Sequence, residues 1–299
     1  MASFWNELPI PFLVLAPMED VTDMAFRELV ATTLPKPDVM FSEFVSSDGI
    51  VYNQSGSVLH KLLFSENQRP VVAQIWGTNL TNLKIATKKI LELGFDGIDI
   101  NMGCPAKDVV KVGGGAGQIK DFVGAVKVVK AVREAAEEMP ISVKTRLGFD
   151  KIETQEWISL LLEQNLAALT IHGRTAKQMS KGQANWEEIG KAVKLRNNIN
   201  PYTKIIGNGD TQSFKEAVQK HESYGVDGIM IGRGIFKDPN VFSKIEKQLT
   251  KEERIDLLNK HKEFIQLYGG SINKFLKMYL NGFTGAKELR IKYLNAIIT

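Results

Sequence analysis

Cys104 is the only cysteine of the chain, and its neighbours favour a reactive position. Residues 94–105 read Gly-Phe-Asp-Gly-Ile-Asp-Ile-Asn-Met-Gly-Cys-Pro. The run 97–102 alternates apolar and polar residues as a strand does, and Gly103 and Pro105 then end it. A lone cysteine is more often a small buried hydrophobe, but the flanking Gly and Pro argue against burial here. We therefore expect Cys104 in a sharp loop just past the carboxyl end of a strand.

Glycine-rich segments follow this loop and two later strands. Residues 111–117 read Lys-Val-Gly-Gly-Gly-Ala-Gly, which lets the backbone approach a flat ligand or a phosphate closely. Residues 207–210 read Gly-Asn-Gly-Asp, and residues 232–234 read Gly-Arg-Gly. In barrels that bind phosphate, the loops after the last two strands commonly supply the site through backbone amides. We expect a phosphate group at these two loops.

Polar side chains also occur in or after other strand-like runs. Lys144 lies within a run, where a charge is costly unless it faces a polar site, the alternative being an exposed lysine at the rim. Gln74 brings an amide that both donates and accepts, which is weak evidence alone. His172 is a lone histidine, more often structural than a ligand, but Arg174 beside it offers a planar fork for a phosphate or a nucleobase edge.

Strand-like runs that alternate with helical stretches would position these residues. Eight apolar runs recur at spacings of about 25 to 40 residues, the pattern of a (β/α)8 TIM barrel, whose chemistry lies at the carboxyl ends of the strands. A doubly wound open sheet is the alternative, weakened because no glycine fingerprint follows the first run. The runs are 12–16, 39–44, 71–76, 97–102, 141–146, 168–172, 204–208 and 228–231, and examples of the helices are 79–93, 122–138, 154–165 and 213–222.

The alternation stops beyond Pro239, and the rest reads as amphipathic helices over 241–249, 254–268, 271–280 and 286–298. We divide the chain into a barrel, residues 1–235, and a small C-terminal α-helical domain, residues 236–299. The second part carries 12 Lys/Arg and 7 Asp/Glu, so it holds the whole basic excess of a chain with net charge +4. That distribution suits contact with a polyanion, although lysines on a solvated helix surface are an equally good explanation. Most tail aromatics are expected in a core.

Composition excludes several classes of protein. At 299 residues, with 43% hydrophobic and 24% charged residues, the chain is long enough for a barrel plus a small domain and is ordinary for a globular protein. One cysteine excludes an internal disulfide, and four histidines without ligand spacing give poor support for a metal. No run approaches a membrane span and no signal peptide is apparent. We expect a cytoplasmic protein, without metal or membrane.

Together these residues resemble the dihydrouridine synthases, flavoenzymes that reduce uridine in tRNA. The resemblance is carried by Ala16-Pro17-Met18, Gln74, residues 101–105, Lys144, residues 172–175, residues 208–210 and residues 232–234, so it spans the expected barrel. It departs from the family at residues 118–121, which read Gln-Ile-Lys-Asp where the family is more apolar, and the tail is on the short side. These differences lie outside the residues that carry the flavin site.

The resemblance implies an FMN cofactor and a nicotinamide reductant, NADPH or NADH, bound transiently. The residues implied to hold FMN are Pro17, Met18, Glu19, Gln74, Lys144, His172, Asn208, Gly209, Asp210, Gly232 and Arg233. Lys144 would stabilise the reduced flavin by a charge-assisted hydrogen bond. The resemblance also implies Cys104 as the general acid. A thiol with an ordinary pKa of about 8.5 keeps its proton at neutral pH, as an acid requires. Asn101 and Arg174 would contact the substrate.

Two other functions compete with this reading. A flavin-dependent oxidoreductase of free pyrimidines, as in dihydroorotate oxidation, would use a similar barrel without needing a basic tail. A non-catalytic RNA-binding protein would use the barrel as a scaffold and would keep its biological function without the thiol of Cys104. We take a monomer as the default expectation, although the motifs leave the oligomeric state open.

Overall fold

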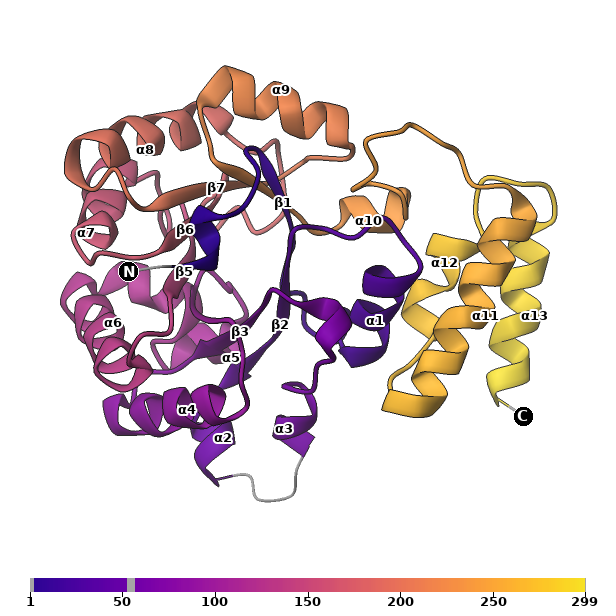
Figure 1. The fold of residues 1–299 in the computed structure, drawn as a ribbon, viewed down its shortest axis with the longest axis horizontal. Coiled ribbons are helices and arrows are strands. Elements are labelled where there is room, and N and C mark those ends of the chain that lie inside the picture. Colours follow the sequence, from indigo (N-terminus) through magenta and orange to yellow (C-terminus); the bar gives the residue numbers. More distant parts are fainter. Residues whose placement is uncertain (1–2, 53–56, 299) are drawn as a thin grey trace.

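The computed structural model describes residues 3–52 and 57–298 and contains a closed barrel of parallel strands in the order β1 to β8 (Figure 1). The strands are β1 (Phe12–Leu15), β2 (Val39–Ser46), β3 (Val71–Trp76), β4 (Gly97–Met102), β5 (Ile141–Arg146), β6 (Ala168–His172), β7 (Lys204–Asn208) and β8 (Gly228–Ile231). Strand β1 pairs with both β2 and β8, which closes the barrel. The predicted TIM barrel is therefore confirmed, and each of the eight predicted runs is a strand.

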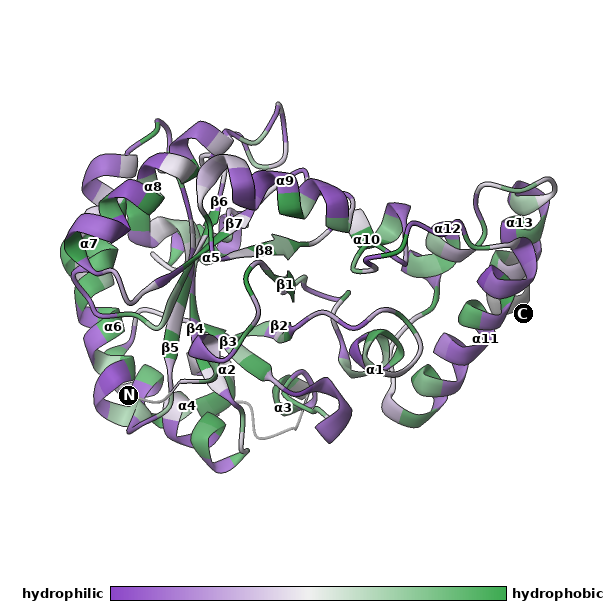
Figure 2. Ribbon diagram, turned by 45° about the horizontal axis from the view of Figure 1, so that its top comes forward, coloured by the Kyte–Doolittle hydropathy of each residue, from purple (hydrophilic) through white to green (hydrophobic). Residues whose placement is uncertain are grey.

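Helices surround this barrel and present mixed hydrophobic and hydrophilic faces, whereas the strands are predominantly hydrophobic (Figure 2). They are α1 (Met24–Thr32), α2 (Ser47–Tyr52), α3 (Ser57–His60), α4 (Leu80–Glu92), α5 (Lys107–Lys111), α6 (Phe122–Ala136), α7 (Ser159–Leu162), α8 (Trp186–Ile199), α9 (Phe214–Tyr224) and α10 (Gly234–Lys237). Short polar side chains start several of them. Asp23, for example, caps α1 by accepting from the backbone N–H of Phe26.

The interior of the barrel is apolar on one side and polar on the other. Strands β1, β2, β7 and β8 contribute apolar side chains such as Phe12, Phe41 and Met230, which pack together with Trp5. Strands β3 to β6 instead place Gln74, Asp99, Ser142, Lys144 and Thr170 in adjacent register. Since successive residues of a strand face opposite sides, these polar residues share the inner face. The polar side of the barrel therefore lies under the ends of β3 to β6.

Three predicted helices differ from the structure. Residues 271–280 contain a 3₁₀ turn, η5 (Asn273–Phe275), followed by the four-residue α12 (Leu276–Tyr279), instead of one regular helix. Residues 154–165 form a π-helical turn η4 (Thr154–Ile158) followed by the short α7, instead of one regular helix. Residues 241–249 are not helical. There the Asn240 side chain donates to the Lys247 carbonyl oxygen at 3.1 Å, and the Ser243 hydroxyl bonds the backbone of Ile245. Such side-chain bonds to nearby backbone compete with helix formation.

The tail helices α11 (Lys251–Tyr268), α12 (Leu276–Tyr279) and α13 (Ala286–Ile298) lie together at one side of the barrel (Figure 1). They dock chiefly through α1: the rings of Phe26 and Phe275 stack with centroids 4.8 Å apart. Phe275 and Tyr279 are fully buried, as expected for core aromatics. The predicted domain boundary after residue 235 falls inside α10. The division of the chain into two domains stays a prediction. None of the helices in the two described ranges has the length and apolarity of a bilayer span.

Candidate active site

A cavity of about 540 Å³ opens at the carboxyl ends of the strands. Most of the residues that the resemblance assigned to a cofactor line it: Pro17, Met18, Lys144, His172, Asn208, Gly209, Asp210, Gly232 and Arg233. Two assigned residues do not line it. Gln74 is fully buried below, and the Glu19 side chain is half-exposed, 3.5 Å from the ammonium of Lys61. The structure therefore brings together residues from five separate parts of the chain around one space.

Cys104 lies beside this cavity in the loop after β4, and Pro105, the next residue, lines it. The side chain of Asn101 accepts from the backbone N–H groups of Gly103 at 3.1 Å and of Cys104 at 2.8 Å. The carbonyl oxygen of Cys104 accepts from Ala116 N at 2.9 Å. Partial burial raises the pKa of the Cys104 thiol above its ordinary value. The thiol is therefore held in a defined loop and keeps its proton at neutral pH.

The glycine run, residues 111–117, packs over the loop that holds Cys104. One position in this run, that of Gly115, accepts only glycine. Gly115 has φ +53°, and a Cβ there would lie 2.7 Å from the carbonyl oxygen of Cys104. Gly113 also has a positive φ of +80°, but its Cβ would meet only Thr78, at 3.4 Å. Residues 115–120 form a 3₁₀ helix, η3 (Gly115–Lys120). The run therefore packs on the backbone of the cysteine loop.

Gln74 and Asn101 bond to each other below the cavity. Asn101 donates to Gln74 Oε1 at 2.9 Å, and Gln74 donates to Asp99 Oδ2 at 2.7 Å. Burial raises the pKa of Asp99 to about 6. Sequence analysis did not single out Asp99, although it shares the alternation that places Asn101 on the inner face. The flavin contact of Gln74 and the substrate contact of Asn101 stay predictions, and both side chains already have partners within the protein.

Lys144 and Arg233 are the two cavity cations for which the described residues provide no acceptor within hydrogen-bonding distance. Burial, followed by repulsion from Arg146, lowers the pKa of Lys144 to about 8, while Asp99 opposes this shift. Arg233 is exposed at the start of α10. A charge that lines a cavity without a protein partner favours an anionic ligand.

Arg146 is a cavity residue that sequence analysis did not assign to the site. Its Nε donates to the Gly103 carbonyl oxygen at 2.6 Å, and its Nη1 donates to the carbonyl oxygens of Thr175 and Met179 at 3.1 and 2.8 Å. It therefore joins the cysteine loop to the loop after β6. The sequence could have identified Arg146 as a site residue, because it lies two residues after Lys144 and therefore on the same face of β5.

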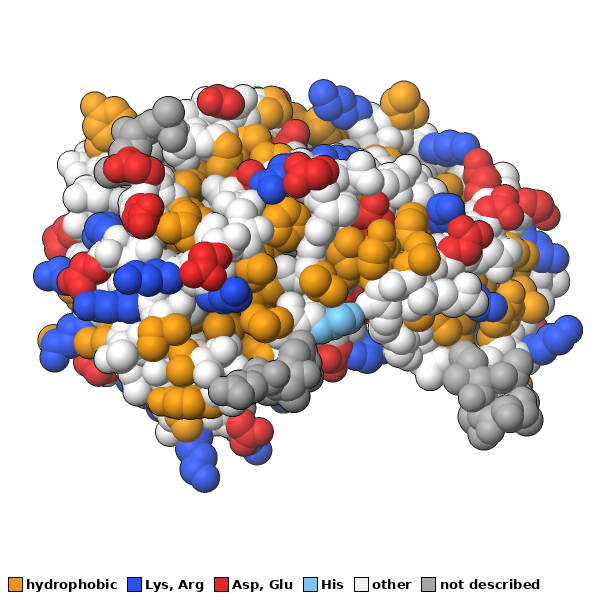
Figure 3. Space-filling view, turned by 60° about the horizontal axis from the view of Figure 1, so that its bottom comes forward, with side chains coloured by type: hydrophobic (Ala, Val, Ile, Leu, Met, Phe, Trp, Pro, Cys, Tyr) orange, Lys and Arg blue, Asp and Glu red, His pale blue; other side chains and the backbone are white. Residues whose placement is uncertain are grey.

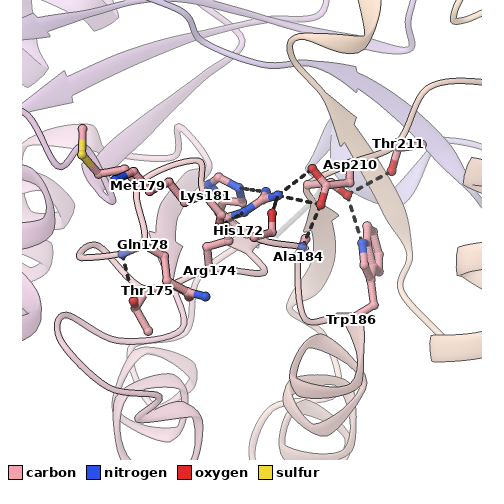
Figure 4. Close-up of polar contacts among 12 residues, drawn as sticks. His172, Arg174, Thr175, Gln178, Met179, Lys181, Ala184, Trp186, Asp210 and Thr211 are labelled. Atoms are coloured by element: carbon pink, nitrogen blue, oxygen red, sulfur yellow. Dashed lines mark hydrogen bonds and ion pairs between the residues drawn. The ribbon is translucent and has the colours of Figure 1, made fainter.

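Arg174 is held between His172 and Asp210, as Figure 4 shows. It is 2% exposed, its Nη1 lies 3.1 Å from His172 Nε2, and its Nη2 lies 2.8 and 2.7 Å from the two Asp210 oxygens. Its remaining bonds go to the carbonyl oxygens of Lys181 and Gly182. Because a guanidinium only donates, His172 accepts at Nε2 and carries its proton on Nδ1. Arg174 also lines the cavity, and the substrate contact that we expected stays a prediction.

The environment of His172 keeps its imidazole neutral. Burial, followed by repulsion from Lys144, Arg146 and Arg174, lowers its pKa to about 2. A neutral ring with its proton on Nδ1 offers one donor, and His172 lines the cavity. Other lining residues that sequence analysis did not single out are Met179, Ser180, Thr211, Gln212 and Lys237. Thr211 and Gln212 directly follow the predicted glycine loop 207–210, which was the available signal.

The loop after β7 packs against the loop after β6, and β7 is tied to β8. Gly209 has φ +128°, and a Cβ there would lie 2.7 Å from the Ala184 side chain. Asn208 donates to the Met230 carbonyl oxygen at 2.8 Å, which ties the end of β7 to β8. Within the described part of the chain, no group of three or more His, Cys, Asp or Glu residues has the arrangement of a metal site.

The sequence matches the profile of the family described as Dihydrouridine synthase (Dus) over residues 14–296. It is 43% identical to "Probable tRNA-dihydrouridine synthase 2" of Bacillus subtilis (strain 168), across 98% of this chain and 92% of that protein. It is 41% identical to "Probable tRNA-dihydrouridine synthase" of Staphylococcus aureus (strain COL), across 98% of this chain and 91% of that protein.

Solved structures with a similar fold are more distant in sequence. Morphinone reductase in complex with tetrahydroNAD matches with a TM-score of 0.54 and 12% identity, over 79% of this chain and 87% of that one. The old yellow enzyme homologue from Zymomonas mobilis matches with a TM-score of 0.51 and 12% identity, over 80% of this chain and 91% of that one. At this identity the likeness concerns the barrel fold.

Proposed function

The chain belongs to the dihydrouridine synthase family, a family of oxidoreductases, and from this membership we propose that it reduces specific uridines of tRNA to 5,6-dihydrouridine with FMN and NADPH. The observation that carries the proposal is the thiol of Cys104 beside a cavity whose cations Lys144 and Arg233 lack protein acceptors among the described residues. An acid next to an anion-binding cavity suits a reaction that adds a hydride and a proton to one double bond.

The residues around the cavity fit FMN. The cavity volume of about 540 Å³ lies in the usual range of cofactor sites. The glycine loops at Gly209 and Gly232 leave room for a phosphate, with Arg233 beside them as a cation. Lys144 and the Nδ1–H of His172 provide donors for the ring, and Pro17 and Met18 provide an apolar surface. Gln74 and Asp210 would support the site from below and from the side, and Glu19 from the rim.

The chain's own part in the reaction is to bind the base and to supply a proton. When bound and reduced by NADPH, or NADH, FMN supplies a hydride for C6 of uridine. Cys104 gives its thiol proton to C5 from the opposite face, and the thiolate then regains a proton from solvent. The raised pKa of Cys104 keeps the proton available. Asn101, whose side chain accepts from the backbone N–H of Cys104, orients the base.

The tail would contact the tRNA backbone, because residues 236–299 hold the basic excess of the chain. On the face shown in Figure 3, Lys and Arg side chains occur over both parts of the molecule and are interspersed with acidic ones. The target uridine must leave its stack to reach the barrel mouth, at a cost of a few kcal/mol. We propose a cytoplasmic monomer that uses no metal.

A two-step experiment tests this function. The purified protein, with its flavin spectrum recorded, is reduced by NADPH without oxygen and then mixed with unmodified tRNA, free uracil or orotate. Reoxidation of the flavin by tRNA, with dihydrouridine formed, is expected. If a free pyrimidine but not tRNA reoxidised the flavin, the flavin-binding barrel would stand. The chain would then be an oxidoreductase of free pyrimidines instead.

A further inference from the structure

A continuous line of buried hydrogen bonds runs under the cavity to the cysteine loop. It starts at Ser142, whose hydroxyl donates to Asp99 Oδ1 at 2.6 Å. Gln74 Nε2 donates to Asp99 Oδ2 at 2.7 Å, and Asn101 Nδ2 donates to Gln74 Oε1 at 2.9 Å. Asn101 Oδ1 then accepts from the backbone N–H of Cys104 at 2.8 Å. We call this line the Asp99 relay, and each bond in it joins a donor to an acceptor.

The carboxylate of Asp99 determines the direction of the whole relay. An ionised carboxylate only accepts, whereas each amide can present either its oxygen or its NH₂ group. Gln74 must therefore turn its NH₂ group toward Asp99, which leaves its oxygen for Asn101. Asn101 must in turn use its NH₂ group on Gln74, which leaves its oxygen for the N–H of Cys104. Reversal of Asn101 would set its NH₂ group against the N–H of Cys104, and reversal of Gln74 would set its NH₂ group against that of Asn101.

We propose that Asp99 is a positioning residue for Cys104, acting through the amides of Gln74 and Asn101. The catalytic consequence rests on the function proposed above, but the geometric role does not. Asp99 is separated from the thiol by two side chains, so it does not take part in proton transfer itself.

Burial makes this orientation effective. Asp99 and Gln74 are 0% exposed and Asn101 is 6% exposed, so bulk water does not replace a bond that is lost. In such surroundings an unpaired donor or acceptor is costly, and the orientation with all partners satisfied prevails. The loop is otherwise anchored by Arg146, which binds the Gly103 carbonyl oxygen and leaves the N–H of Cys104 to the relay.

Three substitutions separate the role of Asp99 from the general effect of a core mutation. Asp99→Leu removes the acceptor and leaves Gln74 free to reverse. Asp99→Asn keeps an oxygen for Gln74, while its NH₂ group can donate to the hydroxyl of Ser142. Thr170→Val is the matched control, since Thr170 is fully buried on the next strand but one and its hydroxyl has no hydrogen-bond partner among the described residues.

The first test needs neither tRNA nor turnover. Cys104 is the only cysteine, so the rate of alkylation by iodoacetamide reports on this loop alone. We expect Asp99→Leu to change the rate at least about 5-fold, because thiol access and thiolate fraction both depend on the loop, and the other two variants to stay within about 2-fold. If Asp99→Leu does not fold, Gln74→Leu is used instead. It removes the bonds of Gln74 to Asp99 and Asn101, and it should change the alkylation rate by the same factor. A wild-type rate in a folded relay-breaking variant would overturn the proposal.

The second test separates the two half-reactions. In Asp99→Leu, reduction of tRNA uridine should slow at least about 10-fold more than flavin reduction by NADPH does, with Asp99→Asn restoring most of the rate. Equal slowing of both half-reactions would show that Asp99 acts on the flavin and would overturn the proposal. If the wild type forms no dihydrouridine, the proposed function fails, whereas the alkylation result still decides the role of Asp99.

Discussion

At the scale of single residues, the cavity is organised by charge. Lys144 and Arg146 enter it from β5 and Arg174 from the loop after β6, and their repulsion helps to keep His172 neutral. Arg146 and Arg174 are bonded to protein acceptors, whereas Lys144 has none among the described residues. The two paired arginines therefore shape the walls, and Lys144 and Arg233 are the groups that an anionic ligand would meet.

A pH dependence follows from the environment of Lys144. Its pKa is lowered to about 8, so the ammonium is charged below that pH and loses its charge above it, and an anion binds better to the charged form. We expect the affinity for FMN to be constant from pH 6.5 to about 7.5 and to weaken above pH 8. Fluorescence titration in the Cys104→Ala background, which removes the neighbouring thiol, measures this directly.

Lys144→Met provides the control for the same titration. It should bind FMN more weakly and lose the weakening above pH 8, because the titrating ammonium is gone. An unchanged alkaline limb in Lys144→Met would mean that another group, such as the half-buried Lys220, controls the binding.

At the scale of elements, the loop after β4 and the glycine run form one unit. The backbone of Cys104 is held by Asn101 from below, by Arg146 through Gly103, and by Ala116 from the glycine run. The thiol is therefore positioned by three elements that are separate in sequence, β4, β5 and η3.

Gly115→Ala should disrupt this unit more than Gly113→Ala. Both positions have a positive φ, which costs about 1–2 kcal/mol for alanine. Only at Gly115 would the added Cβ also press on the carbonyl oxygen of Cys104, at 2.7 Å, which adds roughly 1–3 kcal/mol. Chemical denaturation of the two variants side by side measures the difference. Equal losses of stability would show that the glycine run moves independently of the cysteine loop.

At the scale of the whole molecule, the tail is held on the barrel by an aromatic cluster. Phe275 stacks on Phe26 of α1 and lies edge-on to His261, with centroids 4.6 Å apart. His261 also bonds to the hydroxyl of Tyr279 at 2.8 Å. The barrel mouth and the basic tail therefore keep a fixed relation, which a substrate that contacts both parts would require.

Phe275→Ala tests this attachment. Loss of a fully buried aromatic ring should lower the free energy of unfolding by about 3–5 kcal/mol. The control, Leu267→Ala, changes a side chain of α11 that is 71% exposed and should stay within about 0.5 kcal/mol. Urea unfolding followed by circular dichroism gives both values. A small effect of Phe275→Ala would mean that the tail is held by other contacts.

The barrel could be predicted because each strand is a short apolar run in the sequence, and burial in the barrel agrees with that local pattern. The segment 241–249 could not, since bonds from Asn240 and Ser243 to nearby backbone replace the helix that its apolar spacing suggests. In the site, the resemblance to the family predicted most of the side chains that line the cavity, with Gln74 and Glu19 as the exceptions. Their partners depend on strand register, so the bonds of Gln74 to Asp99 and of Arg174 to Asp210 appear only in three dimensions.

The most direct measurement of the central claim is a map of dihydrouridine, position by position, in tRNA incubated with NADPH and either wild type or Cys104→Ala. We expect dihydrouridine at defined positions with the wild type and a loss of at least about 100-fold in rate with the variant, whose flavin spectrum stays unchanged. Dihydrouridine formed at the wild-type rate by Cys104→Ala would contradict the assignment of the acid. Its absence with the flavin-loaded wild type would contradict the reaction itself.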